Sequence, residues 1–68
     1  MCRSIKQLRE GSEPATREEV EAAALQFIRK ISGYRQPSRK NADAFERAVL
    51  EVSDSATRLL DSITAAAA

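Results

Sequence analysis

Hydrophobic residues recur at the period of an α-helix over two stretches of the chain. In the first stretch they follow the i, i+4, i+7, i+8, i+11 spacing of one buried helix face, at Val20, Ala24, Phe27, Ile28 and Ile31. Thr16 with Glu19 three residues later has the sequence of a capping box, and Gly33 is a suitable C-cap. The pattern predicts a helix over about 17–32, within the segment 16–33.

The second stretch keeps the same period for roughly five turns. Its apolar positions are Phe45, Ala48, Val49, Val52, Ala56, Leu59, Leu60 and Ile63. They predict a longer helix over about 39–63, within the segment 39–64. Ser38 and Asn41 are both acceptable N-caps, so the pattern leaves the first residue of this helix open. The alanines at 65–68 are good helix formers with nothing to bury, and we expect a frayed tail there.

The connection between the two helices, 34–38, is short. Such a connection favours antiparallel neighbours, so the sequence predicts an all-α fold built on a helical hairpin. A short N-terminal segment and linker, 1–15, precedes the hairpin, and the whole chain, 1–68, is expected to form a single small helical domain.

The second helix is the longer one, so the first cannot cover all of its apolar stripe. Leu59 and Ile63 need a cover that the first helix is too short to give. One candidate is the N-terminal segment, where Met1, Ile5 and Leu8 have helical spacing. The other is a second copy of the chain, and we expect dimerisation to complete the fold.

Two further leucines lie away from the main stripes. Leu25 and Leu50 fall outside the spacing of their helices and suggest a second contact face. With Leu59 and Ile63 they are the residues expected at a partner interface.

Length and composition bound the function. The chain has 68 residues, below the size at which one core stabilises a fold comfortably, and many of its hydrophobic residues are alanine. A thin core of this kind favours self-association or a protein partner. The formal net charge of +1 argues against a general nucleic-acid binder, so nucleic acid is the less favoured partner.

Several classes of protein are disfavoured. No apolar run approaches the roughly 18 residues of a membrane span, and the start lacks the apolar core of a secretory signal. We therefore expect a cytoplasmic protein with no membrane contact. Histidine is absent and no pair of carboxylates forms a defensible acid–base pair, so we expect no enzymatic activity, no cofactor and no metal centre.

Five cations lie between Arg29 and Lys40 with no acid among them. The candidate anion- or nucleic-acid-binding residues of this basic turn are Arg29, Lys30, Tyr34, Arg35, Ser38, Arg39 and Lys40. A solvated turn is the simpler interpretation, because Arg29 and Lys30 also complement a helix C-terminus.

Cys2 is the only cysteine, so no intrachain disulfide can form. Removal of Met1 would expose an amine and a thiol that could bind a soft metal or act as a redox sensor. A small buried residue is the alternative interpretation.

Three ordered motifs carry a resemblance to a known family. They are the start Met-Cys-Arg-Ser-Ile-Lys, the stretch 23–34 and the stretch from Pro37-Ser38 to 44–49. The chain resembles small bacterial proteins classed as domain of unknown function 2277, whose members open Met-Cys-Arg-Asn-Ile-Lys. The resemblance implies a recurring pattern at Cys2, at Arg29-Lys30 and in the Gly33–Ser38 turn, and it brings no activity with it.

The sequence therefore favours a non-enzymatic helical module that serves in interaction or regulation. An accessory RNA-, DNA- or anion-binding protein that uses the basic turn is the first alternative. A thiol-based sensor or metal site at Cys2 is the second.

Overall fold

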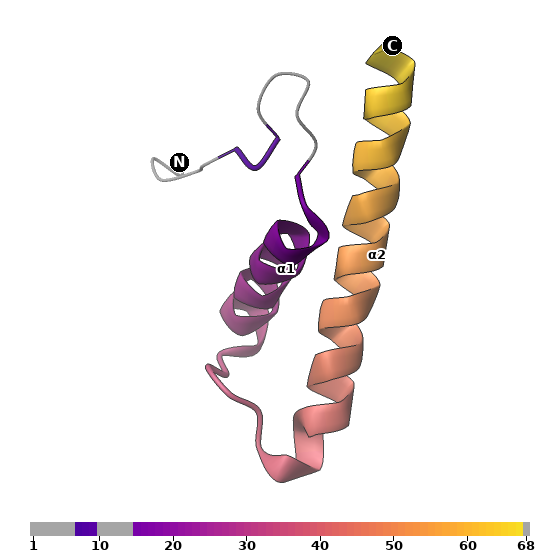
Figure 1. The fold of residues 1–68 in the computed structure, drawn as a ribbon. Helices are drawn as coiled ribbons and strands as arrows, with labels where there is room; N and C mark the ends of the chain where they lie inside the picture. The colour runs from indigo at the N-terminus through magenta and orange to yellow at the C-terminus, as the bar shows by residue number, and fades with distance from the viewer. Residues whose placement is uncertain (1–6, 10–14, 68) are drawn as a thin grey trace.

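The structure is a computed structural model that describes residues 7–9 and 15–67. Its elements are α1 (Arg17–Ser32), the 3₁₀ turn η1 (Arg39–Asn41) and α2 (Ala42–Ala67). Figure 1 shows α1 and α2 side by side, joined at one end by the turn, with α2 extending well past the start of α1. The predicted all-α hairpin is confirmed within the described residues.

Both ends of α1 are fixed by local hydrogen bonds. The Thr16 hydroxyl accepts from the Glu19 backbone N–H at 3.1 Å, and the Glu19 carboxylate accepts from the Thr16 N–H at 2.8 Å. Gly33 ends the helix with a φ of 79°, and its N–H donates to the Arg29 carbonyl at 2.9 Å. The predicted capping box and C-cap are confirmed. Both depend only on residues close together in the sequence, so the sequence pattern is enough to predict them.

The second helical stretch begins at Arg39, as expected for a cap at Ser38, but its first three residues form the 3₁₀ turn η1. Ser38 occupies the N-cap position of η1 without a side-chain hydrogen bond to the turn, and its carbonyl accepts from the Asn41 N–H at 3.0 Å. The α-helix proper begins only at Ala42. Arg39 and Lys40 thus lie in a tight 3₁₀ turn that leads into α2.

The end of α2 lies beyond the predicted one. The helix continues to Ala67 instead of ending near Ile63. Alanine has the most favourable intrinsic helix propensity, so the sequence allows the helix to extend into the terminal run.

The core between the helices is small. Val20, Ala24 and Ile28 are the buried apolar residues of α1, and they repeat every four positions along one line. The prediction that Phe27 and Ile31 share this buried face is wrong, because both are exposed. None of the helices in the described part of the chain is both long enough and apolar enough to span a bilayer.

Candidate interaction surface

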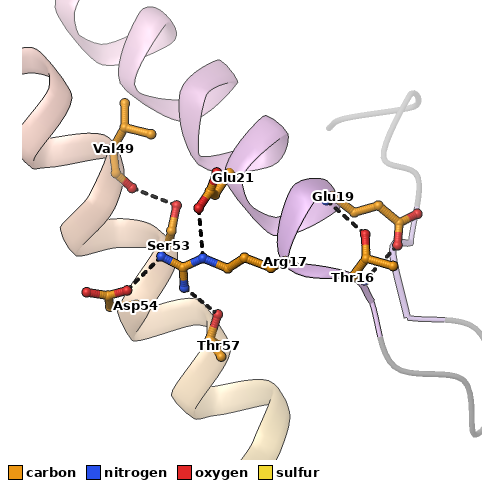
Figure 2. Close-up of polar contacts among 8 residues, drawn as sticks. All are labelled: Thr16, Arg17, Glu19, Glu21, Val49, Ser53, Asp54 and Thr57. Atoms are coloured by element: carbon orange, nitrogen blue, oxygen red, sulfur yellow. Dashed lines mark hydrogen bonds and ion pairs between the residues drawn. The ribbon is translucent and has the colours of Figure 1, made fainter.

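The contact between the helices is centred on a serine. Ser53 is the one buried polar residue of the described chain, and its hydroxyl donates to the Val49 carbonyl one turn earlier at 2.7 Å (Figure 2). A small side chain whose polar atom bonds to its own helix lets a neighbouring helix approach closely at no cost in unpaired polar groups. α1 therefore packs on the Ser53 line of α2.

That line is off the centre of the apolar stripe of α2. At about 100° per residue, Val52 is turned by about 100° from Ser53. Val52 and Ala56 are only partly buried, and the Leu59 side chain remains 60% exposed. α1 covers one edge of the stripe and leaves the rest uncovered.

One side of the crevice between the helices is bridged by Arg17 (Figure 2). The guanidinium donates from Nε to Glu21 at 2.8 Å, from Nη2 to Asp54 at 2.8 Å, and from Nη1 to the Thr57 hydroxyl at 3.0 Å. The hydrogen bond to Glu21, followed by that to Asp54, raises the pKa of Arg17 above its usual value. The side chains of Arg17, Glu21 and Asp54 are all substantially solvated, so the bridge orients the helices more than it stabilises them.

The opposite side of the crevice is open and apolar. A groove of about 270 Å³ there is lined by Leu8, Val20, Ala23, Ala24, Phe27, Val52, Ala56, Leu59 and Leu60. A second groove of about 310 Å³, nearer the turn, is lined by Ile28, Ile31, Ser32, Tyr34, Asn41, Ala44, Phe45 and Ala48. Phe27 with Ile31, and Ala48 with Val52, are four residues apart, so the two grooves adjoin along the same helix surfaces. We call these two grooves together the open apolar face.

Large side chains stand at half exposure or more on this face. Phe27 is 50% exposed, Ile31 is 64% exposed and Leu59 is 60% exposed. None of the described residues that line its two grooves is charged. Exposed apolar side chains thus follow both helices along this face.

The three leucines and one isoleucine predicted at a partner interface are not on one surface. Leu25 and Leu50 line a separate groove of about 420 Å³ with Pro37, Phe45, Glu46 and Val49. Leu59 lines the open apolar face, and Ile63 is partly buried. Leu50 and Leu59 are nine residues apart, which places them on opposite sides of α2.

The basic turn is only partly gathered. Arg29, Tyr34 and Arg35 line a shallow depression of about 380 Å³ together with Gln26 and Gly33. The Arg29 Nε donates to the Arg35 carbonyl at 2.9 Å, so this guanidinium braces the turn.

The other four candidates of the basic turn are apart from this depression. Lys30, Ser38, Arg39 and Lys40 are exposed and do not contribute to its lining. The seven residues therefore do not share one depression, and their role in anion binding stays a prediction.

The remaining chemical candidates are not tested by the structure. Cys2 lies outside the described residues, as do Met1 and Ile5. Within the part of the chain that is described, no three His, Cys, Asp or Glu residues come together as a metal site.

Sequence analysis missed the two polar features that position the helices. Ser53 follows Val49 by four residues on the edge of the apolar stripe, which was a usable signal for a small contact residue. The pairing of Arg17 with Asp54 and Thr57 had no such signal, because it depends on how far the two helices slide past each other.

The fold and its surface define the class of protein: a small all-α protein whose helical hairpin leaves the open apolar face uncovered. The chain belongs to the family described as Uncharacterized conserved protein (DUF2277), which it matches over residues 1–68. This membership confirms the resemblance read from the three motifs. No curated protein and no solved structure matches the chain.

Proposed function

We propose that the protein is a non-enzymatic interaction module that works by binding a protein surface through the open apolar face. One observation carries the proposal: Phe27, Ile31 and Leu59 keep half or more of their surface in water on a face whose described lining holds no charge. Covering these side chains removes apolar area from water, and each Å² removed contributes about 25 cal/mol to the free energy of binding.

The polar side of the hairpin supports this choice of face. Arg17 joins Asp54 and Thr57 across the crevice and bridges that side, near the start of α1, with hydrogen bonds. A partner there would have to displace paired charges, whereas the open apolar face offers no polar group of that kind.

Labelling of introduced cysteines tests this function without knowledge of the partner. Leu59→Cys and Leu50→Cys, each in a Cys2→Ser background, place one thiol on each side of α2 at similar native exposure. In intact cells that express the protein, we expect position 59 to react with a permeant maleimide at least about tenfold more slowly than position 50, because bound surface excludes the reagent. Equal labelling of the two positions would contradict the proposed function.

Anion binding is the second candidate, and the depression that joins Arg29, Tyr34 and Arg35 favours it. Phosphate or a short RNA would contact the guanidinium of Arg35, while Tyr34 offers a stacking surface. Titration with either ligand should then shift the amide resonances of residues 33–35, and RNA binding should weaken steeply with salt. Unchanged resonances at millimolar phosphate would remove this candidate.

The thiol-based function at Cys2 stays a prediction with its own test. Intact mass measurement shows whether Met1 is removed, and retention of Met1 excludes the aminothiol chemistry. A Cys2→Ser variant that behaves like the native protein under oxidant would exclude a sensor.

A further inference from the structure

We infer that the surface bound by the open apolar face is the same face of a second copy of the chain, so that two hairpins form a four-helix bundle. This inference rests on the proposed function and names the partner in it. Helical hairpins that pair in this way bury their apolar stripes in a common core.

The distribution of charge on α2 is the first observation behind it. All seven charged residues of α2 lie outside the arc of about 120° that holds its apolar stripe. They are Asp43, Glu46, Arg47, Glu51, Asp54, Arg58 and Asp61. In a two-fold contact the same patch is buried on both copies, so a charge near the axis would meet its own copy and a charge elsewhere on the patch would need an opposite charge on the same patch. A face without charge meets this requirement.

The groove of about 270 Å³ on this face carries both large and small side chains. Phe27 and Leu59 stand out on it, while Ala23, Ala24 and Ala56 leave room in its lining. Each copy thus offers projections and a recess that can accept them, as packing of knobs into holes requires. This combination suits an isologous contact.

The Leu25–Leu50 groove is the weaker place for a second copy. It includes Glu46, and a two-fold contact would bury this carboxylate in both copies with no cation among the residues that line the groove. The structure therefore provides a matched control on the other side of the same helix.

Sedimentation equilibrium of the full chain from about 1 to 100 μM tests the inference, with Leu59→Glu and Leu50→Glu as the paired variants. The two leucines are 60% and 52% exposed and receive the same charge, and they differ chiefly in the side of α2 on which they lie. We expect the native chain to be dimeric. Leu59→Glu should raise the dimer dissociation constant at least about a hundredfold, because a carboxylate would be buried unpaired. Leu50→Glu should change it by less than about threefold.

Each outcome decides the question. A dimer that Leu59→Glu dissociates and Leu50→Glu leaves intact supports the inference, whether the dissociated variant stays helical or unfolds in circular dichroism. A native monomer at 100 μM, a dimer insensitive to Leu59→Glu, or one equally sensitive to both variants would overturn it. A monomer whose position 59 is still protected in cells would keep the proposed function and assign the face to a different protein. A monomer labelled equally at positions 50 and 59 would contradict both.

Discussion

At the scale of single residues, the decisive feature of the molecule is the small side chain at the helix contact. Ser53 is fully buried and satisfies its hydroxyl within its own helix, on the Val49 carbonyl. Its role is therefore steric: it allows α1 to approach, and its hydrogen bond adds little. Leu59, which has a far larger apolar side chain, remains exposed because α1 lies over the Ser53 line of α2 instead of over it.

Substitutions at Ser53 should distinguish the effect of side-chain size on stability from the effect of the hydroxyl group. Ser53→Ala should change the free energy of unfolding by less than about 1 kcal/mol, because it leaves no donor unpaired and a hydroxyl bonded one turn back adds little to a helix. Ser53→Leu should lower it by about 1–3 kcal/mol through overpacking. Urea denaturation followed by circular dichroism measures both. A large loss in the alanine variant would show that the hydrogen bond matters more than the space.

At the scale of the elements, a helix end can be predicted from the sequence when the residues that set it are close together in the chain. The ends of α1 are set by residues three or four positions apart, and Thr16, Glu19 and Gly33 behave as predicted. At the start of the second helical stretch two caps compete, and Ser38 takes the N-cap position of the 3₁₀ turn η1, which leads into α2 at Ala42. The far end of α2 was placed too early because the alanine run itself continues the helix.

Gly33 offers a test of this local control. Its φ of 79° lies in the left-handed region, and a Cβ added there would meet no atom within 4 Å. Gly33→Ala should therefore cost about 1 kcal/mol of stability for backbone reasons alone, and Gly33→Asn should cost less. Thermal unfolding of the two variants beside the native protein makes the comparison. Stabilisation by alanine, as occurs at glycines with negative φ, would contradict the described turn.

At the scale of the whole molecule, the hairpin could be predicted but the side on which it opens could not. The short turn after Gly33 was enough to predict antiparallel helices, and the family was recognised from its motifs. Sequence periodicity defines an apolar stripe on each helix, but it does not determine which part of the α2 stripe packs against α1. In the structure α1 sits on the edge of the stripe of α2, and this offset, together with the greater length of α2, leaves Leu59 exposed.

The central claim is that this offset creates a face that a second copy covers. The most direct measurement is an isotope-filtered nuclear Overhauser experiment on a sample that mixes labelled and unlabelled chains, which detects contacts between copies alone. We predict intermolecular contacts from the Phe27 ring and the Leu59 methyl groups, and none from the methyl groups of Leu50. Contacts that involve Leu25 and Leu50 while Phe27 and Leu59 show none, or no intermolecular contact at millimolar concentration, would contradict the account.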